Sequence, residues 1–281
     1  MTDPVQDQVW FITGGNSGFG LALSKAVLTR GGCVAAAIRS PDGQAVATLQ
    51  DFGKDRLHVL RLDVTNTEDV QAAVDDAVKY FGHLDVVVNS AGRGSFGSLE
   101  ETSDAEVRDL FEVNVFGSLN VVRAALPTLR RQRHGHLVQI SSLAGIAPPA
   151  PGLAAYAATK FAVEGISEVL AKEVAHLGIG VTIVEPGDFR TGFGNSLHVT
   201  PPALPDYAQS VAAAAQAFAS MDPTQLGDPD KAAAVIIDAV TSAHPPLRLA
   251  LGEDAIEGIR TKLTDQLVQG QAWEAVGRGM R

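Results

Sequence analysis

Residues 9–20 read VWFITGGNSGFG, an apolar run that leads into a glycine-rich turn. Val9–Thr13 carries the β-branched and aromatic side chains of a strand, and Leu21–Arg30 continues as a helix that stops at Gly31 and Gly32. Glycines in such a turn let the backbone approach a phosphate closely, and the N–H groups at the start of the helix favour an anion. The stretch therefore predicts a strand, a phosphate-binding turn and a helix in direct succession.

The same alternation of short apolar runs and longer helical stretches continues along the chain. Because the strands are continuously apolar and alternate with helices, the sequence predicts an α/β fold. We expect a doubly wound (Rossmann), mostly parallel sheet of about seven strands with helices on both faces, which binds ligands beyond the carboxyl ends of its strands. The further strands are predicted at Cys33–Ile38, Leu57–Leu62, Leu84–Val88, His136–Ile140, Ile179–Val184 and Leu247–Leu251, and the helices at Thr67–Phe81, Asp104–Arg133 (bent late by Pro127) and Ala154–Leu177.

The whole chain, residues 1–281, is expected to form a single dinucleotide-binding catalytic domain, because this length is ordinary for one α/β unit. The stretch from Thr200 to Pro229 is rich in proline and alanine and is the least strand-like part. We therefore expect a substrate-pocket insertion or lid at about 192–229 rather than a second domain.

Composition excludes several classes of function. The net charge of −10 argues against nucleic acid, since the one basic group, at 130–134, suits the solvent-facing end of a helix. No apolar run is long enough to span a membrane, and Met1–Gln8 does not resemble a signal peptide. The single cysteine, Cys33, fits a reducing, cytoplasmic setting. Histidine and cysteine are too scattered for a metal site, so no metal is expected.

A possible catalytic group lies in the second half of the predicted sheet. Tyr156 and Lys160 are four residues apart in a predicted helix and share a face, although this spacing alone occurs on many helices. A phenol, with its ordinary pKa near ~10, is a poor base, but a neighbouring ammonium favours the phenolate and allows proton exchange with an alcohol. Ser142 follows a predicted strand, where a hydroxyl can orient a substrate oxygen. Asn114 is unfavourable inside a helix, which indicates either a solvent-facing or a functional position.

Five motifs occur in order between roughly residues 8 and 192. They are the glycine loop at 13–20, Asn-Ser-Ala-Gly at 89–92, Asn114, Ser-Ser ahead of Tyr-x-x-x-Lys, and Pro186-Gly187. This ordered set, with its Gly-x-x-x-Gly-x-Gly spacing, resembles the short-chain dehydrogenase/reductase family. The resemblance implies a nicotinamide-dependent oxidoreductase that interconverts a ketone or aldehyde and an alcohol.

The resemblance also implies roles for individual residues. Tyr156 is the general acid/base, Lys160 lowers its pKa and holds the cofactor ribose, Ser142 orients the substrate oxygen, and Asn114 supports a proton-relay water. Ser90 stands where the family has a second asparagine, a mild departure. The residues expected to contact the cofactor are Gly14, Asn16, Ser17, Gly18, Phe19, Gly20, Arg39, Asp63, Val64, Asn89, Ala91, Gly92, Tyr156, Lys160, Pro186, Gly187 and Thr191. Without the resemblance, Asp63 is equally well a cap for the turn that follows it.

Arg39 bears on which nicotinamide cofactor is bound. Cofactors without a 2′-phosphate usually meet an acidic side chain about twenty residues past the glycine loop. Here the second strand ends in Ile38 followed by Arg39, whose guanidinium can pair with a 2′-phosphate. The sequence therefore favours NADP(H) over NAD(H); the alternative is a surface arginine that ends a strand.

One spacing departs from the family pattern. Ser142 and Tyr156 are fourteen positions apart, one more than is usual in the family, and the extra residue is expected in the loop 146–151. Either Ser141 or Ser142 can then supply the catalytic hydroxyl. We choose Ser142, because the Leu-Ala-Gly that follows it matches the family's run.

The expected partners are a small-molecule carbonyl or alcohol and further copies of the chain. A fairly apolar substrate is favoured, and a cofactor pool kept reduced favours carbonyl reduction. Members of the family commonly form homodimers or homotetramers, often through helices that match 104–133 and 154–177 here. The pocket candidates are Arg93, Phe96, Leu143, Ile146, Phe189, Phe193 and Leu197–Ala219.

Two other functions are compatible with a nucleotide-binding fold. A non-catalytic, redox-sensing regulator would bind NADP(H) without turnover, but it has no need of Tyr156, Lys160, Ser142 and Asn114 together. An epimerase or dehydratase of the related longer-chain type uses a different glycine spacing and is ranked last.

Overall fold

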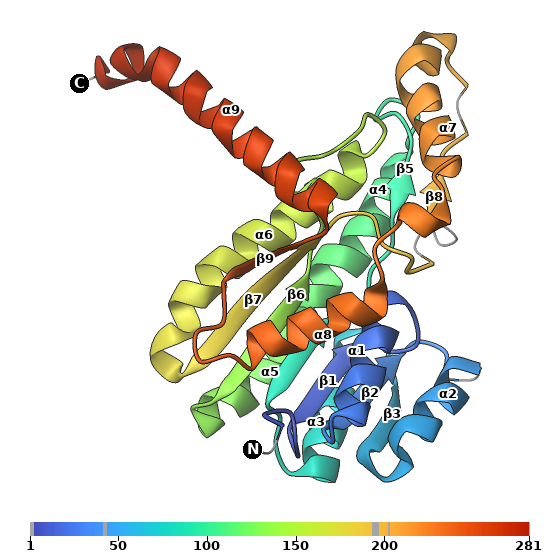
Figure 1. Cartoon of the computed structure of the whole chain (residues 1–281), viewed down its shortest axis with the longest axis vertical. Helices are drawn as coiled ribbons and strands as arrows, with labels where there is room; N and C mark the ends of the chain where they lie inside the picture. Colours follow the sequence, from blue (N-terminus) through green and yellow to red (C-terminus); the bar gives the residue numbers. More distant parts are fainter. Residues whose placement is uncertain (1–2, 42–43, 193–196, 202, 281) are drawn as a thin grey trace.

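A computed structural model of the chain describes residues 3–41, 44–192, 197–201 and 203–280. Seven parallel strands form one sheet in the order β3-β2-β1-β4-β6-β7-β9 (Figure 1). The order steps outward in both directions from β1, which is the doubly wound arrangement that the sequence predicts. The strands are β1 Val9–Thr13, β2 Cys33–Ile38, β3 Leu57–Arg61, β4 Val86–Asn89, β6 Gly135–Ile140, β7 Ile179–Pro186 and β9 Arg248–Leu251.

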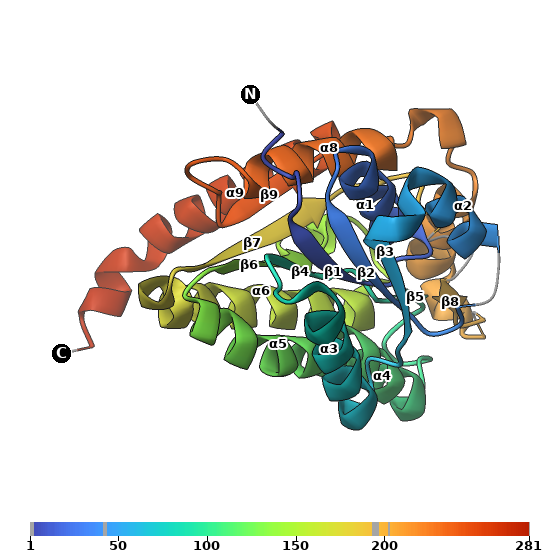
Figure 2. The same cartoon turned by 90° about the horizontal axis from the view of Figure 1, so that it is seen from below.

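Helices cover both faces of this sheet (Figure 2). On β1, Trp10 and Ile12 face one helical layer, whereas Val9 and Phe11 face the other, because successive side chains of a strand point to opposite faces. One layer holds α1 Gly18–Thr29, α2 Gln44–Gly53 and α8 Pro229–Val240, and the other holds α3 Thr67–Phe81, α5 Ser118–Gln132 and α6 Ala154–Val174. Helices α2 and α8 are absent from the sequence prediction.

The long helix predicted at Asp104–Arg133 is three elements. Helix α4, Asp104–Phe111, begins with a capping box between Ser103 and Glu106, and a π-helix, Glu112–Gly117, joins it to α5. Pro127 lies inside α5, which continues to Gln132, so the interruption is earlier than the sequence predicts. It falls at Asn114, the residue that is unfavourable in a regular helix.

Short elements complete the chain around the carboxyl edge of the sheet. Strand β5 pairs with β8 in a small second sheet, and the described part of the expected lid follows as a series of short helices ending at Gln225. The elements are β5 Ser95–Phe96, β8 His198–Val199, a π-helix at Ala208–Ala212, α7 Ala213–Ala219, and 3-10 helices at Lys54–Arg56, Leu143–Gly145, Ala175–Leu177, Pro205–Tyr207 and Pro223–Gln225. Phe193, a predicted pocket residue, lies outside the described residues.

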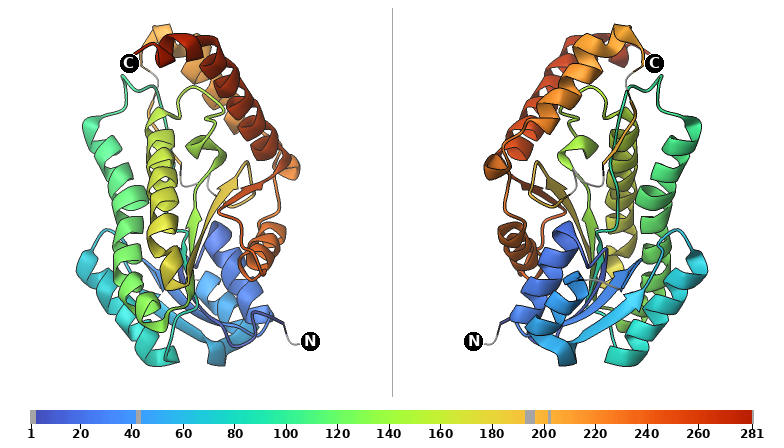
Figure 3. Two further views of the ribbon diagram at one scale, coloured as in Figure 1. Left: turned by 90° about the vertical axis from the view of Figure 1, so that its left-hand side faces the viewer. Right: turned by 90° about the vertical axis from the view of Figure 1, so that its right-hand side faces the viewer.

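The chain ends in helix α9, Glu253–Arg278, which the sequence prediction does not contain. It begins beside the end of β9 and projects away from the sheet and its two helical layers (Figures 1 and 3). Among the described residues, no helix combines the length and apolar character needed to cross a membrane.

Candidate active site

The glycine loop lies against two later segments at the carboxyl edge of the sheet. Gly14 and Gly18 adopt φ of +67° and +49°, a left-handed conformation that side chains rarely adopt. A Cβ on Gly14 would lie 3.2 Å from the Ala91 Cα, and one on Gly18 would lie 3.3 Å from the Thr191 Cβ. Three of the predicted cofactor segments, 13–20, 89–92 and 186–191, are thus brought together.

The loop has the features of a cradle for a pyrophosphate. Ser17 is the N-cap of α1 but forms no side-chain cap hydrogen bond, so the amides of the first helical turn face outward. A Cβ on Gly20 would collide with the Gly14 carbonyl, so the third glycine is required for the turn itself. The Phe19 ring packs edge-on against Phe189 with ring centres 5.2 Å apart, which ties the loop to the segment after β7. The residues present therefore fit a dinucleotide.

Thr13 holds the Asn-Ser-Ala-Gly turn in register with β1. Its hydroxyl accepts hydrogen bonds from the Ser90 and Ala91 amides, each at 3.1 Å, and is buried. The Asn89 amide is also buried and donates to Ser118 O and Gln139 Oε1, so this side chain braces the turn from behind. The sequence prediction omits Thr13 from the site, although a polar residue closing an apolar strand is the available signal.

The other end of the proposed cofactor site combines Arg39 and Asp63. Arg39 is exposed after β2. The Asp63 carboxylate accepts from the Thr65 amide at 3.0 Å and the Thr65 hydroxyl at 2.7 Å, so it does cap the following turn. These bonds, together with the positive charge of Arg39, hold the pKa of Asp63 below its ordinary value. The Val64 carbonyl accepts from Asn120, which fixes this turn against α5.

Helix α6 places Tyr156 and Lys160 beside the end of β6. Both side chains are buried, with the Lys160 Nζ 5.7 Å from the centre of the Tyr156 ring. Lys160 donates to the Ile140 carbonyl at 2.9 Å, which anchors the ammonium to the end of β6, two residues before Ser142. The Ser142 hydroxyl forms a hydrogen bond with Tyr156 and also accepts from the Ala144 amide at 3.1 Å. The predicted tyrosine, lysine and serine are thus adjacent.

Burial dominates the acid–base character of this group. It raises the pKa of the Tyr156 phenol to about 12, opposed by the hydrogen bond with Ser142 and reinforced by the charge of Asp188. Burial lowers the pKa of Lys160 to about 8, and the charge of Glu164 opposes that shift. The lowered tyrosine pKa expected from the sequence is therefore not found in the protein chain by itself, and the phenol is a proton donor at neutral pH.

Asn114 is buried, so it does not occupy the solvent-facing position that the sequence leaves open for it. Its amide donates to the Arg93 carbonyl at 2.9 Å and to the Thr159 hydroxyl at 3.1 Å, and its oxygen accepts from the Arg93 amide at 3.0 Å. A Cβ on Gly92 would lie 3.2 Å from the Asn114 oxygen and 3.9 Å from the Lys160 Nζ. Asn114 therefore lies within the same cluster as the lysine, and Thr159 is a further member that the sequence prediction omits.

Ser141 and Ser142 face different partners. Ser141 is buried on the side of Glu164. A Cβ added to Gly145 would lie 2.7 Å from the Ser141 hydroxyl and 3.2 Å from Glu164 Oε1, so these two oxygens flank the same glycine. The other oxygen of Glu164 accepts from Arg248 at 2.5 Å, and burial raises the pKa of this carboxyl to about 7. Glu185 also binds Arg248, so a buried ionic cluster lies behind the catalytic candidates.

The predicted pocket residues form a mixed group. Phe96 and Leu143 are buried, whereas Ile146 and Phe189 are half-buried. The Phe96 ring stacks on Phe218 of the expected lid with centres 6.5 Å apart, which places that lid beside the site. Arg93 is partly exposed and forms a long ion pair with Asp109, at 3.8 Å.

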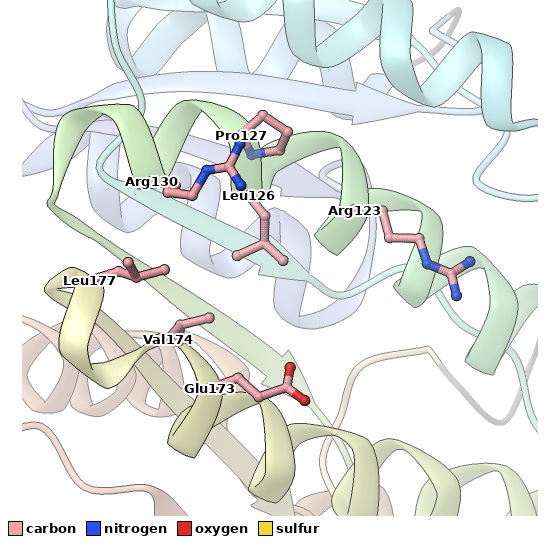
Figure 4. A pocket seen from close by; sticks show the side chains of 7 residues that line it. All are labelled: Arg123, Leu126, Pro127, Arg130, Glu173, Val174 and Leu177. Carbon is pink, nitrogen blue, oxygen red and sulfur yellow. The ribbon is translucent and has the colours of Figure 1, made fainter.

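A cavity of about 340 Å³ lies elsewhere, between α5 and the end of α6 (Figure 4). Glu173, one of its residues, is thirteen positions beyond Lys160, roughly 20 Å along a helix, so this is a separate surface. No cluster of metal-ligating side chains occurs among the described residues. The cavity is lined by Arg123, Leu126, Pro127, Arg130, Glu173, Val174 and Leu177.

Comparisons with known sequences identify the family. A family model described as short chain dehydrogenase matches residues 8–201. The oxidoreductase BOA17 of Botryotinia fuckeliana is 39% identical and aligns over 89% of this chain and 90% of its own length. A 3-ketodihydrosphingosine reductase of Bacteroides thetaiotaomicron is 36% identical, over 88% and 89% respectively.

Solved structures show the same architecture. A short-chain dehydrogenase from Streptomyces avermitilis matches with a TM-score of 0.90 and 40% identity, over 98% of this chain and all of that one. A family member from Burkholderia phymatum in complex with NAD has a TM-score of 0.83 and 27% identity, over 96% and 97%. An alcohol dehydrogenase from Thermococcus sibiricus in complex with 5-hydroxy-NADP has a TM-score of 0.70 and 25% identity, over 88% and 96%. With its family motifs gathered at one edge of the sheet and these relatives matched along most of its length, the chain belongs to the short-chain dehydrogenase/reductase family of oxidoreductases.

Proposed function

We propose that the protein is an NADP(H)-dependent carbonyl reductase that converts a fairly apolar ketone or aldehyde into an alcohol. The observation that carries the proposal is the adjacency of Tyr156, Ser142 and Lys160 beside the glycine loop. A bound nicotinamide supplies the hydride, and the chain's own residues supply the proton and the orientation.

The side chains divide the remaining work. The Tyr156 phenol donates its proton to the substrate oxygen as negative charge develops there, and its raised pKa keeps that proton in place at neutral pH. The Ser142 hydroxyl, already paired with the phenol, orients the same oxygen. Lys160 stabilises the phenolate that remains and reaches the cofactor ribose. Asn114, fixed by Arg93, supports the water through which the proton is replaced.

Arg39 is the proposed determinant of cofactor choice. Arg39 is exposed directly after β2, and the described residues 38–41 at this strand end include no carboxylate that could hold free ribose hydroxyls. Its positive charge also lowers the pKa of Asp63. We expect Arg39→Ala to weaken NADPH binding at least tenfold, in line with loss of a charged contact, while NADH binding changes little. Equal losses for both cofactors would remove Arg39 from this role.

The apolar character of the substrate rests on Phe96, Leu143 and Ile146, which surround the predicted pocket and carry no charge. The Bacteroides relative is named for reduction of a ketone on a long-chain substrate, which is compatible with such a pocket.

Pairing of subunits through α5 and α6 is part of the proposal. The groove between these helices combines apolar Leu126, Val174 and Leu177 with charged residues of both signs at its rim, which suits a partner with the same surface (Figure 4). Light scattering would test it, and a monomer at micromolar concentration would contradict it.

The experiment that tests the reaction uses NADPH and a panel of apolar ketones and aldehydes, followed by loss of NADPH absorbance. Tyr156→Phe is run in parallel and is expected to lower kcat about 10²- to 10⁴-fold with NADPH binding retained. Equal turnover by both proteins would overturn the mechanism. Tight NADPH binding without turnover on any panel member would instead favour the redox-sensing regulator.

A further inference from the structure

Helix α9 makes almost no contact with the body of the protein. Of its residues from Glu253 to Arg278 only Ala255 is buried, and every residue from Arg260 to Met280 is exposed. The helix is roughly 39 Å long and projects away from the helices and sheet of the body (Figure 1). Its exposed apolar side chains are Ile256, Leu263, Leu267, Val268, Trp273 and Val276.

A helix of this kind needs a covering surface. Isolated helices are marginal in water, and most helical stability in proteins comes from packing of an apolar face. Trp273 is 69% exposed and Leu267 62%, which is unusual for such large apolar side chains in a water-facing helix. The body of this chain provides no cover, so a second molecule must do so.

The root of α9 is held firmly, so the projecting part has a fixed direction. The Asp254 carboxylate accepts from the Asp188 amide at 2.7 Å, beside Gly187. Gly258 lies against Leu143, since a Cβ there would be 3.1 Å from that side chain. The helix therefore presents its surface as a rigid arm from the edge of the candidate active site.

Four apolar residues of α9 follow the spacing of a helix-pairing seam, and Leu267 lies at its flank. Ile256, Ile259 and Leu263 are separated by three and four residues, and Trp273 falls at the same seam ten residues beyond Leu263. The seam positions between and beyond them are Gln266, Gly270 and Gly277, which are small or uncharged. Large side chains thus occupy the first half of the seam and small ones much of the second.

This asymmetry suits a second copy that runs in the opposite direction. With a two-fold axis close to Leu267, Ile259 meets the partner's Gly277 and Leu263 meets the partner's Trp273. Arg260 then lies opposite the partner's Glu274 at the flank of the seam. The surface ion pairs that these two residues form within their own helices are worth little and can be exchanged.

Charge also argues against the other arrangements. A parallel pair would place the acidic starts of both helices, with Glu253, Asp254 and Glu257, side by side. An anionic membrane surface would meet a helix with five acidic and three basic side chains between residues 253 and 278. An antiparallel copy instead places the acidic start against the end that carries Arg278.

We propose that α9 is a pairing arm through which two copies of this chain associate antiparallel, about a two-fold axis close to Leu267. This contact is separate from the α5–α6 surface. A chain that uses both surfaces forms a tetramer, and one that uses α9 alone forms a dimer.

Cysteine cross-linking tests the contact directly in a Cys33→Ser background. Leu267→Cys brings two thiols together across the axis, so mild oxidation is expected to give a covalent dimer at micromolar concentration. Thr261→Cys lies on the opposite face of the same exposed helix and is the matched control, expected to stay uncross-linked. Equal cross-linking of both variants, or of neither, would overturn the pairing.

Charge exchange gives a second, independent readout. Arg260→Glu and Glu274→Arg should each weaken the association about tenfold, because each disrupts two symmetry-related contacts, and the double variant should restore it. Sedimentation of all four proteins measures this. Unchanged association in both single variants overturns the proposal, as does co-sedimentation of the parent with phosphatidylcholine vesicles while it remains a monomer.

Discussion

The Lys160 ammonium lies 5.7 Å from the centre of the Tyr156 ring and donates to the carbonyl of Ile140 rather than to the phenol. The ammonium is thus close enough that its charge would favour a phenolate at Tyr156. Burial disfavours the charged form of both groups, since it raises the pKa of the phenol to about 12 and lowers that of the ammonium to about 8. Of these two groups, Lys160 therefore changes its charge nearer to neutral pH.

The first prediction concerns the pH dependence of carbonyl reduction. Because the Lys160 pKa is lowered to about 8, its charge is present below that pH and is lost as pH rises above it. Tyr156 remains protonated over this range. We expect kcat/KM for reduction to be level from pH 6 to 7.5 and to fall about tenfold for each unit well above pH 8. A profile level to pH 10 would contradict this.

The second prediction concerns Glu164, one helical turn beyond Lys160. Its negative charge raises the pKa of the lysine, so Glu164→Gln should move the alkaline fall in activity to lower pH. Other charged groups around this pair are Glu185 and Arg248 behind it and Asp188 beside the phenol.

Glu168→Gln is the matched control for that variant. Glu168 binds the same Arg248, at 2.8 Å, but its side chain is 47% exposed. The charge that raises the pKa of Lys160 is that of Glu164. The pH profile should then remain unchanged. Equal shifts in the two variants would mean that the Arg248 cluster as a whole, and not Glu164, sets the lysine's pKa.

The third prediction separates the two adjacent serines. Ser142 is hydrogen-bonded to Tyr156, so Ser142→Ala should lower kcat about 10- to 100-fold, the usual effect of one hydrogen bond to a developing charge. Ser141 faces Glu164 instead, so Ser141→Ala should keep kcat within about threefold. Steady-state kinetics of both variants with one substrate measure this. A larger loss in the Ser141 variant would reverse the assignment.

Much of the fold follows from local pattern. The apolar runs at Val9–Thr13 and Cys33–Ile38 and the helical spacing at Thr67–Phe81 predict the observed elements to the residue. Side-chain periodicity carries this information because the strands bury both faces under helices and the helix buries one face against the sheet. The ordered motifs then predict which strand ends meet, since all seven strands are parallel and share one carboxyl edge.

Other features lie beyond local pattern. Helix α9 buries only Ala255 against its own chain, so packing within a single chain does not account for it. The Arg248 cluster joins residues more than sixty positions apart, and no spacing predicts it. The raised Tyr156 pKa depends on how deeply the ring is buried, which the packing of α6 against α4 and the 3-10 helix at Leu143–Gly145 determines.

The last prediction concerns the segment that precedes α7, where Glu101 binds two consecutive backbone amides and Glu100 binds Tyr207. Glu101 accepts from the Ala203 amide at 2.5 Å and the Leu204 amide at 2.8 Å, while its other oxygen accepts from Ser98 at 2.5 Å. These bonds lower the pKa of Glu101, so its carboxylate stays charged as pH falls below neutrality. The contact is lost only when the pH falls past this lowered pKa and the carboxylate is protonated. The proposed lid is therefore tied to the loop between β5 and α4.

Glu101→Ala should release this segment without removing any residue of the catalytic group. We expect faster amide hydrogen exchange across residues 203–219 and a raised KM with a smaller change in kcat, because a segment acting as the proposed lid would contribute to substrate binding and not to proton transfer. Glu101→Gln keeps one acceptor oxygen and should lie between the parent and the alanine variant. Glu68→Ala, at the exposed start of α3, is the distant control. A fall in kcat with KM unchanged would mean that the segment acts on the chemical step instead.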